Sequence, residues 1–131
     1  MRNEQAVRDN LEIIAGQVKN QINTLILQAD RYTKSMNEDY EYFFRWYAEE
    51  MYKIQVELFY YRELQKVVNT DSLCGVLTYL DCKVKEFTDE LLVGGLRQHS
   101  TSSATNLAHT LKLEVKQQLR KRFQGLINGI K

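Results

Sequence analysis

The sequence predicts an all-α protein folded as an antiparallel, up-down-up-down four-helix bundle with coiled-coil-like seams. Three observations favour this fold class. The chain of 131 residues has no proline and only six glycines, so residues that interrupt helices are scarce. Apolar side chains recur every three or four positions along four segments. Short polar stretches separate most of these segments, which places consecutive helices antiparallel to one another. The predicted helices cover residues 4–34, 38–68, 72–93 and 103–127.

The first predicted helix, 4–34, has a single apolar stripe and is otherwise polar. Such a stripe has the spacing of a coiled-coil seam and needs one partner face. The periodicity is lost from Lys34 to Asn37, where we expect a turn, with Asn37 capping the next helix. The stripe consists of Val7, Leu11, Ile14, Val18, Ile22, Leu25, Ala29 and Tyr32.

The second predicted helix, 38–68, holds ten of the fourteen aromatic residues and is the segment around which the others must pack. Aromatic rings carry the largest apolar areas, so we expect one face of this helix to be buried. That face comprises Tyr40, Phe43, Phe44, Tyr47, Met51, Ile54, Leu58 and Tyr61.

The third and fourth predicted helices, 72–93 and 103–127, repeat the same helical period. Polar residues at 69–72 and Ser102 or Ser103 are suited to cap their N-termini. Between the two helices, 94–106 is rich in small and polar residues and is interpreted as the longest loop. The expected core along the four seams includes Leu11, Ile14, Tyr47, Ile54, Leu80 and Leu111.

The length fits one domain, residues 1–131, with an ordinary globular balance of 44% apolar and 27% charged residues. The main rival to the bundle is an elongated hairpin of the first two helices that is completed by a second chain. Cys74 and Cys82 are eight positions apart on one helix, too far apart to bridge, and are expected to be half-buried reduced thiols. No apolar run is long enough to span a membrane, and the N-terminus lacks the apolar core of a signal peptide. We therefore expect a cytoplasmic protein.

Sequence motifs for catalysis, cofactors or metals are absent. There is no nucleophile elbow, no Cys-x-x-Cys and no glycine-rich phosphate loop. The two histidines, His99 and His109, lack the Glu-x-x-His spacing of di-iron bundles and are interpreted as solvated side chains. We accordingly predict a non-enzymatic protein with no catalytic residues, no cofactor and no metal site, although an enzyme with an unrecognised site remains a third possibility.

The aromatic helix is also apolar on the side opposite its predicted core face. Tyrosine and tryptophan are enriched where proteins bind one another, because a rigid ring brings apolar area at little entropic cost. Two structural alternatives are that these rings lie flat on the surface, or that the helix is central and touches two others. The predicted protein interface consists of Tyr42, Trp46, Val56, Tyr60 and Leu64.

A charge asymmetry lies behind the net charge of +1. Residues 1–96 carry 11 basic and 16 acidic side chains, a net of −5, whereas residues 97–131 carry 7 and 1, a net of +6. The basic side chains could balance acidic helices within the fold, dock on an acidic partner or a second copy, or contact phosphates or an anionic membrane surface. The predicted basic patch is His109, Lys112, Lys116, Arg120, Lys121 and Arg122.

Together these patterns predict a helical-bundle interaction protein, a small adaptor, regulator or accessory subunit that binds a protein partner or a second copy of itself. The alternative is a nucleic-acid-associated accessory protein that uses the basic last helix. Nucleic acid is the less favoured partner, because no aromatic side chains are interleaved with the basic ones.

Overall fold

The computed structural model describes residues 4–94 and 102–130, which form five helices and no strand. The prediction of an all-α fold is therefore confirmed. The helices are α1 (Glu4–Glu38), α2 (Tyr40–Trp46), α3 (Ala48–Thr70), α4 (Leu73–Gly94) and α5 (Ser103–Ile130). Most of the loop predicted between the last two helices, residues 95–101, lies outside the described residues.

The first turn of the chain is tighter than the sequence predicts. Residues 34–37 are helical, and α1 ends only at Glu38. The chain reverses at Asp39, whose backbone is extended (φ −153°, ψ 92°) and whose carboxylate accepts a 3.1 Å hydrogen bond from the backbone N–H of Tyr42. The prediction that Asn37 is the cap is wrong, because the extended residue that can satisfy the free N–H groups of the next helix is Asp39.

The predicted helix 38–68 is divided at Tyr47 into α2 and α3. The backbone of Tyr47 leaves the helical region (φ −125°, ψ −9°), although its N–H still donates to Phe43 and its carbonyl still accepts from Met51, both at 2.8 Å. The Tyr47 ring packs against Tyr32 of α1 with ring centroids 5.0 Å apart. The break therefore coincides with a packing contact between two helices and needs neither glycine nor proline.

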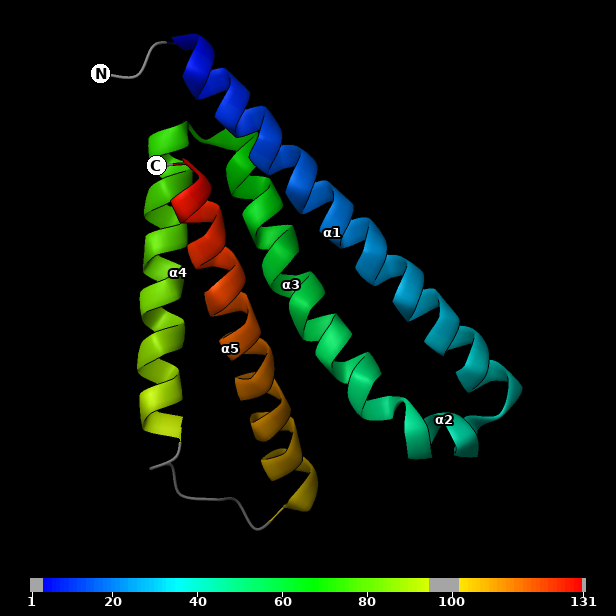
Figure 1. The fold of residues 1–131 in the computed structure, drawn as a ribbon. Helices are drawn as coiled ribbons and strands as arrows, with labels where there is room; N and C mark the ends of the chain where they lie inside the picture. Colours follow the sequence, from blue (N-terminus) through cyan, green and yellow to red (C-terminus); the bar gives the residue numbers. More distant parts are fainter. Residues whose placement is uncertain (1–3, 95–101, 131) are drawn as a thin grey trace.

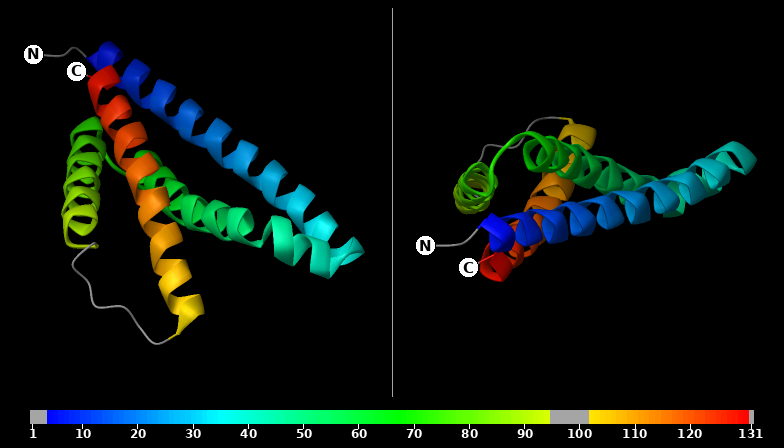
Figure 2. Two further views of the ribbon diagram at one scale, coloured as in Figure 1. Left: turned by 60° about the horizontal axis from the view of Figure 1, so that its bottom comes forward. Right: turned by 90° about the horizontal axis from the view of Figure 1, so that it is seen from above.

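The long helices form two antiparallel hairpins, α1 with α3 and α4 with α5 (Figure 1). The hairpins meet at the end of the molecule that holds the start of α1 and the end of α5, and they diverge towards the other end (Figure 2). Successive long helices run in opposite directions (Figure 1). The closed four-helix bundle and the coiled-coil seams are not confirmed, because the four helices do not stay side by side along their lengths.

The core gathers side chains from all four long helices. Phe87 of α4 and Tyr61 of α3 pack against Phe123 of α5, with ring centroids 6.1 Å and 5.8 Å apart. Leu64 and Leu80 are fully buried beside them. Of the predicted core residues, Ile14, Ile54, Leu80 and Leu111 are buried, whereas Leu11 and Tyr47 are half-buried.

The helix caps predicted in the second half of the chain are confirmed. Ser72 accepts a hydrogen bond from the backbone N–H of Gly75, and Ser102 accepts one from Thr105, each at 3.3 Å. The prediction of half-buried thiols is wrong: Cys74 and Cys82 are free and exposed, because they lie on the side of α4 that faces away from the core. Within the described residues, no helix has the length and apolar character that crossing a membrane requires.

Candidate interaction surface: the aromatic tip

Four aromatic side chains are exposed at the far end of the α1–α3 hairpin, and we call this group the aromatic tip. It consists of Tyr40, Tyr42, Phe44 and Trp46 of α2, which are 63%, 49%, 65% and 64% exposed. Figure 1 shows that α2 lies at the end of the hairpin farthest from α4. Helix α2 packs against α1 and α3. The tip thus lies beyond the region where the two hairpins meet.

The composition of α2 explains why its rings are exposed. Five of its seven residues are aromatic. A helix of about two turns can direct only one face to its neighbours, so five bulky rings cannot all be buried. Phe43 takes the inward position and is 6% exposed. Three of the remaining rings pack against aromatic neighbours: Tyr40 stacks on Phe44 at 6.4 Å, and Tyr42 meets Tyr47 edge-on at 5.6 Å.

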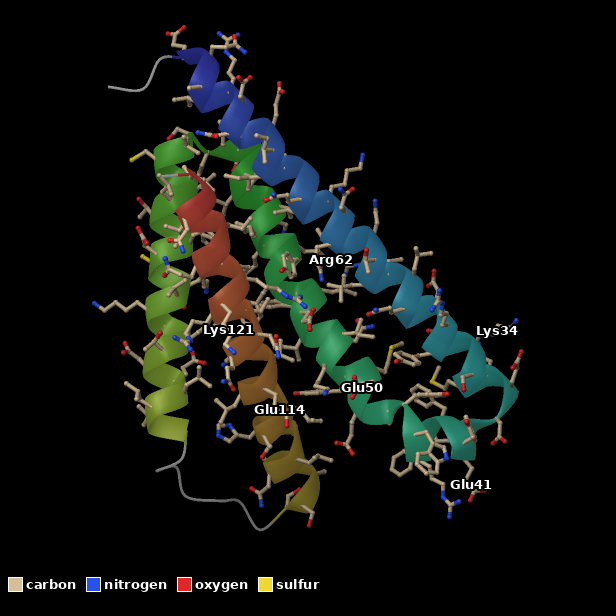
Figure 3. The ribbon with its side chains drawn as sticks, viewed as in Figure 1. Lys34, Glu41, Glu50, Arg62, Glu114 and Lys121 are labelled. Carbon is tan, nitrogen blue, oxygen red and sulfur yellow. The ribbon has the colours of Figure 1, made fainter. Side chains whose placement is uncertain are left out.

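The aromatic tip is surrounded by more acidic than basic side chains. From Lys34 to Glu49 the chain carries four acidic and two basic residues, a net of −2. Figure 3 shows Glu41 at the end of the hairpin. A hollow of about 250 Å³ opens here, lined by Asp39, Glu41, Tyr42, Arg45 and Trp46. Aromatic faces and carboxylates therefore meet in one small concave surface.

The structure divides the predicted interface into two groups. Tyr42 and Trp46 belong to the aromatic tip. Val56 is half-buried against the core, and Tyr60 is half-buried with its ring edge-on to Phe87 at 5.1 Å. Leu64 is fully buried, so its placement on an outer face is wrong. The reason is that α3 is central and packs against α1, α4 and α5, which was one of the alternatives considered for this helix.

Tyr40 and Phe44 are the tip residues that sequence reasoning missed, because both were assigned to the core face. The assignment failed where the hairpin extends beyond the helices that cover the rest of that face. One sequence signal could have found them. The run of Tyr40 to Trp46 places five aromatic residues within two turns, which is more than a single buried face can hold.

The predicted basic patch does not form one surface. Lys116 makes an ion pair with Glu90 of α4, and Nη1 of Arg122 lies 3.2 Å from Oε2 of Glu57 on α3. His109 and Arg120 are half-buried, so the prediction of a solvated His109 is wrong. Lys112 and Lys121 are exposed. For Lys116 and Arg122 the structure favours the intramolecular interpretation, in which basic side chains of α5 balance acidic side chains of α3 and α4.

A polar groove of about 700 Å³ lies between α1, α3 and α5. Among the residues that line it, Nζ of Lys53 is 3.0 Å from Glu50 and 3.5 Å from Glu114, so one cation links α3 to α5. Figure 3 shows Glu50 and Glu114 on these two helices. The hydrogen bond to Glu50 is the main reason that the pKa of Lys53 is raised. The charged groups of the groove are mostly paired with one another, which leaves few of them to act on a ligand.

Within the residues that the structure describes, no group of three or more His, Cys, Asp or Glu side chains is arranged to hold a metal ion. No protein-family model, no curated protein and no solved structure matches this chain. The aromatic tip is therefore judged on its own chemistry, as four exposed aromatic side chains on one short helix.

Proposed function

We propose that this chain is a non-enzymatic interaction protein that binds a protein partner through the aromatic tip. The observation that carries the proposal is the exposure of Tyr40, Tyr42, Phe44 and Trp46 on one short helix. Tyr40 and Phe44 lie on one flank of α2 and Tyr42 and Trp46 on the other, and exposed apolar patches on soluble proteins mark binding sites. Tyrosine and tryptophan are also the residues that contribute most to binding energy at interfaces.

The packing of the tip suits it for binding. Tyr40 stacks on Phe44 and packs against the buried Phe43, and Tyr42 packs against Tyr47, so these three rings lose little rotamer freedom when a partner covers them. The hairpin carries them beyond the rest of the molecule (Figure 2), which gives a partner room to approach. The partner is another protein or a second copy of the chain.

A capture experiment with matched variants tests the proposal. The chain is immobilised and exposed to native lysate, and the double variant F44S/W46S is compared with F59S. Phe59 is a suitable control because it is an aromatic residue of α3 that is 60% exposed and lies outside the tip. We expect the tip variant to lose a captured protein that F59S retains. Sedimentation of the purified chain and of the same two variants at high concentration tests whether a second copy of the chain binds at the tip.

Equal capture by both variants, with circular dichroism showing that both are folded, would overturn the proposal. So would loss of capture by F59S alone, because that would move the binding surface to α3.

Nucleic acid remains the less favoured partner. Two of the basic side chains required for it, those of Lys116 and Arg122, are engaged with Glu90 and Glu57. We therefore expect no binding of labelled duplex or single strand near physiological salt. Binding that weakens steeply with salt, with a slope of about −0.9 per duplex phosphate contact, would favour the nucleic-acid alternative instead.

A further inference from the structure

We infer that the partner of the aromatic tip presents a positively charged amphipathic segment, with a Lys or Arg side chain entering the hollow between Glu41 and Trp46. This inference rests on the proposed function and adds the chemistry of the partner. It follows from the local charge of the tip and from the residues that line the hollow. It also follows from a comparison with two other possible partners, a second copy of the chain and an anionic membrane.

The charge of the tip is opposite to that of the whole chain. Residues 34–49 carry a net of −2, whereas the chain carries +1. A cationic segment is consequently attracted to the tip and not to the protein as a whole. Such complementarity directs a partner to one surface and disfavours wrong partners.

The hollow offers two kinds of interaction to a cation. The carboxylates of Asp39 and Glu41 supply negative charge, and the rings of Tyr42 and Trp46 supply aromatic faces. An ammonium or guanidinium group over an aromatic face is attracted by the negative face of the ring. Arg45 also lines the hollow and offsets one of the carboxylates, which leaves a net of −1 for an incoming cation.

The apolar part of the partner follows from the two rings that line the hollow. Tyr42 and Trp46 are 49% and 64% exposed, and they lie on the flank of α2 opposite Tyr40 and Phe44. A segment that places aliphatic side chains on one side of a cation would cover both rings of the hollow. An amphipathic helix with basic residues next to its apolar face has this arrangement.

Two other surfaces fit the tip less well. A second copy docking tip to tip would bring two acidic segments together, and like charges that face one another in an interface oppose binding. An anionic membrane surface would repel the same carboxylates. Lipid binding through the rings alone is treated as an outcome of the test below.

Trp46 makes the inference directly testable, because it is the only tryptophan in the chain and lines the hollow. The probes are two short amphipathic helical peptides of equal length, one of leucine and lysine and one of leucine and glutamate. We expect the lysine peptide to shift Trp46 emission to the blue, with affinity falling as salt is added. The glutamate peptide should leave the emission unchanged.

Charge-reversal variants supply the control. E41K should weaken binding of the lysine peptide by about tenfold, because it replaces an attraction by a repulsion within the hollow. E12K changes the net charge by the same amount on an exposed position of α1, well before the hairpin tip, and should bind as the wild type does. Equal affinities of E41K and E12K would overturn the inference, as would equal responses to the two peptides.

Vesicles of neutral phosphatidylcholine complete the experiment. A blue shift of Trp46 with vesicles but not with the lysine peptide would overturn the inference in favour of a lipid surface. If F44S/W46S loses a captured protein while neither peptide binds, the proposed function stands and only the chemistry assigned to the partner is wrong.

Discussion

Nη1 of Arg122 on α5 lies 3.2 Å from Oε2 of Glu57 on α3, and the pair joins the two hairpins beside the polar groove. Burial raises the pKa of the Glu57 carboxyl above its usual value of 4.5, and the neighbouring Arg122 only partly opposes this effect. Burial likewise raises the pKa of the Tyr61 hydroxyl above its usual value, and the neighbouring Arg122 opposes this effect only in part. The link between the hairpins therefore depends on a carboxylate that is costly to ionise.

This pKa gives stability a definite dependence on pH. The folded protein holds the Glu57 proton to higher pH than the unfolded chain, so this group lowers the free energy of unfolding as pH rises from 4.5 through the folded pKa. E57Q lacks the titration. We expect the free energy of unfolding of E57Q, relative to wild type, to increase over that pH interval, as measured by urea denaturation. If the difference in free energy of unfolding between E57Q and wild type does not change with pH, the raised pKa of Glu57 is contradicted.

Leu64 tests the central position of α3. It is fully buried, so L64A should lower the free energy of unfolding by about 2–5 kcal/mol through lost transfer energy and the cavity left behind. F59A, at an exposed position of the same helix, should change it by about 0.5 kcal/mol or less. Chemical denaturation measures both. An unchanged free energy of unfolding for L64A would contradict the buried position of Leu64 and favour an outer face instead.

Asp39 tests the turn that positions the aromatic tip. D39A removes the hydrogen bond accepted from Tyr42 and should cost about 0.5–2 kcal/mol of stability. N37A lies within the last turn of α1 and should be neutral or slightly stabilising, because alanine favours a helix more than asparagine does. Thermal unfolding distinguishes the two variants. A larger loss for N37A would place the cap at the residue that the sequence alone suggests.

The helices and most of the core were predictable from periodicity. A single apolar face on an otherwise polar helix can be oriented only towards the core. The apolar stripe is accordingly buried along α1 at Ile14, Val18, Ile22, Leu25 and Ala29, and along α5 at Leu111, Val115, Leu119 and Phe123. The caps at Ser72 and Ser102 follow from local chemistry that depends on a few neighbouring residues.

The arrangement of the hairpins and the extent of the tip could not be predicted in the same way. Trp46 and Leu64 fall on one face of a continuous helix, yet the break at Tyr47 places them on different helices, one exposed and one buried. The break keeps its backbone hydrogen bonds and has no glycine or proline, so the sequence carries no local sign of it. Whether a ring is covered also depends on how far α4 and α5 reach, which is a property of the whole chain.

Site-specific photo-crosslinking tests the central claim, that the aromatic tip is the surface that binds a partner. A photoreactive phenylalanine analogue replaces Phe44 in one variant and Phe59 in another, since the two rings are similarly exposed on different helices. After irradiation in native lysate, we predict a crosslinked adduct from position 44 and none from position 59. Adducts of equal yield from both positions, or from position 59 alone, would contradict the account.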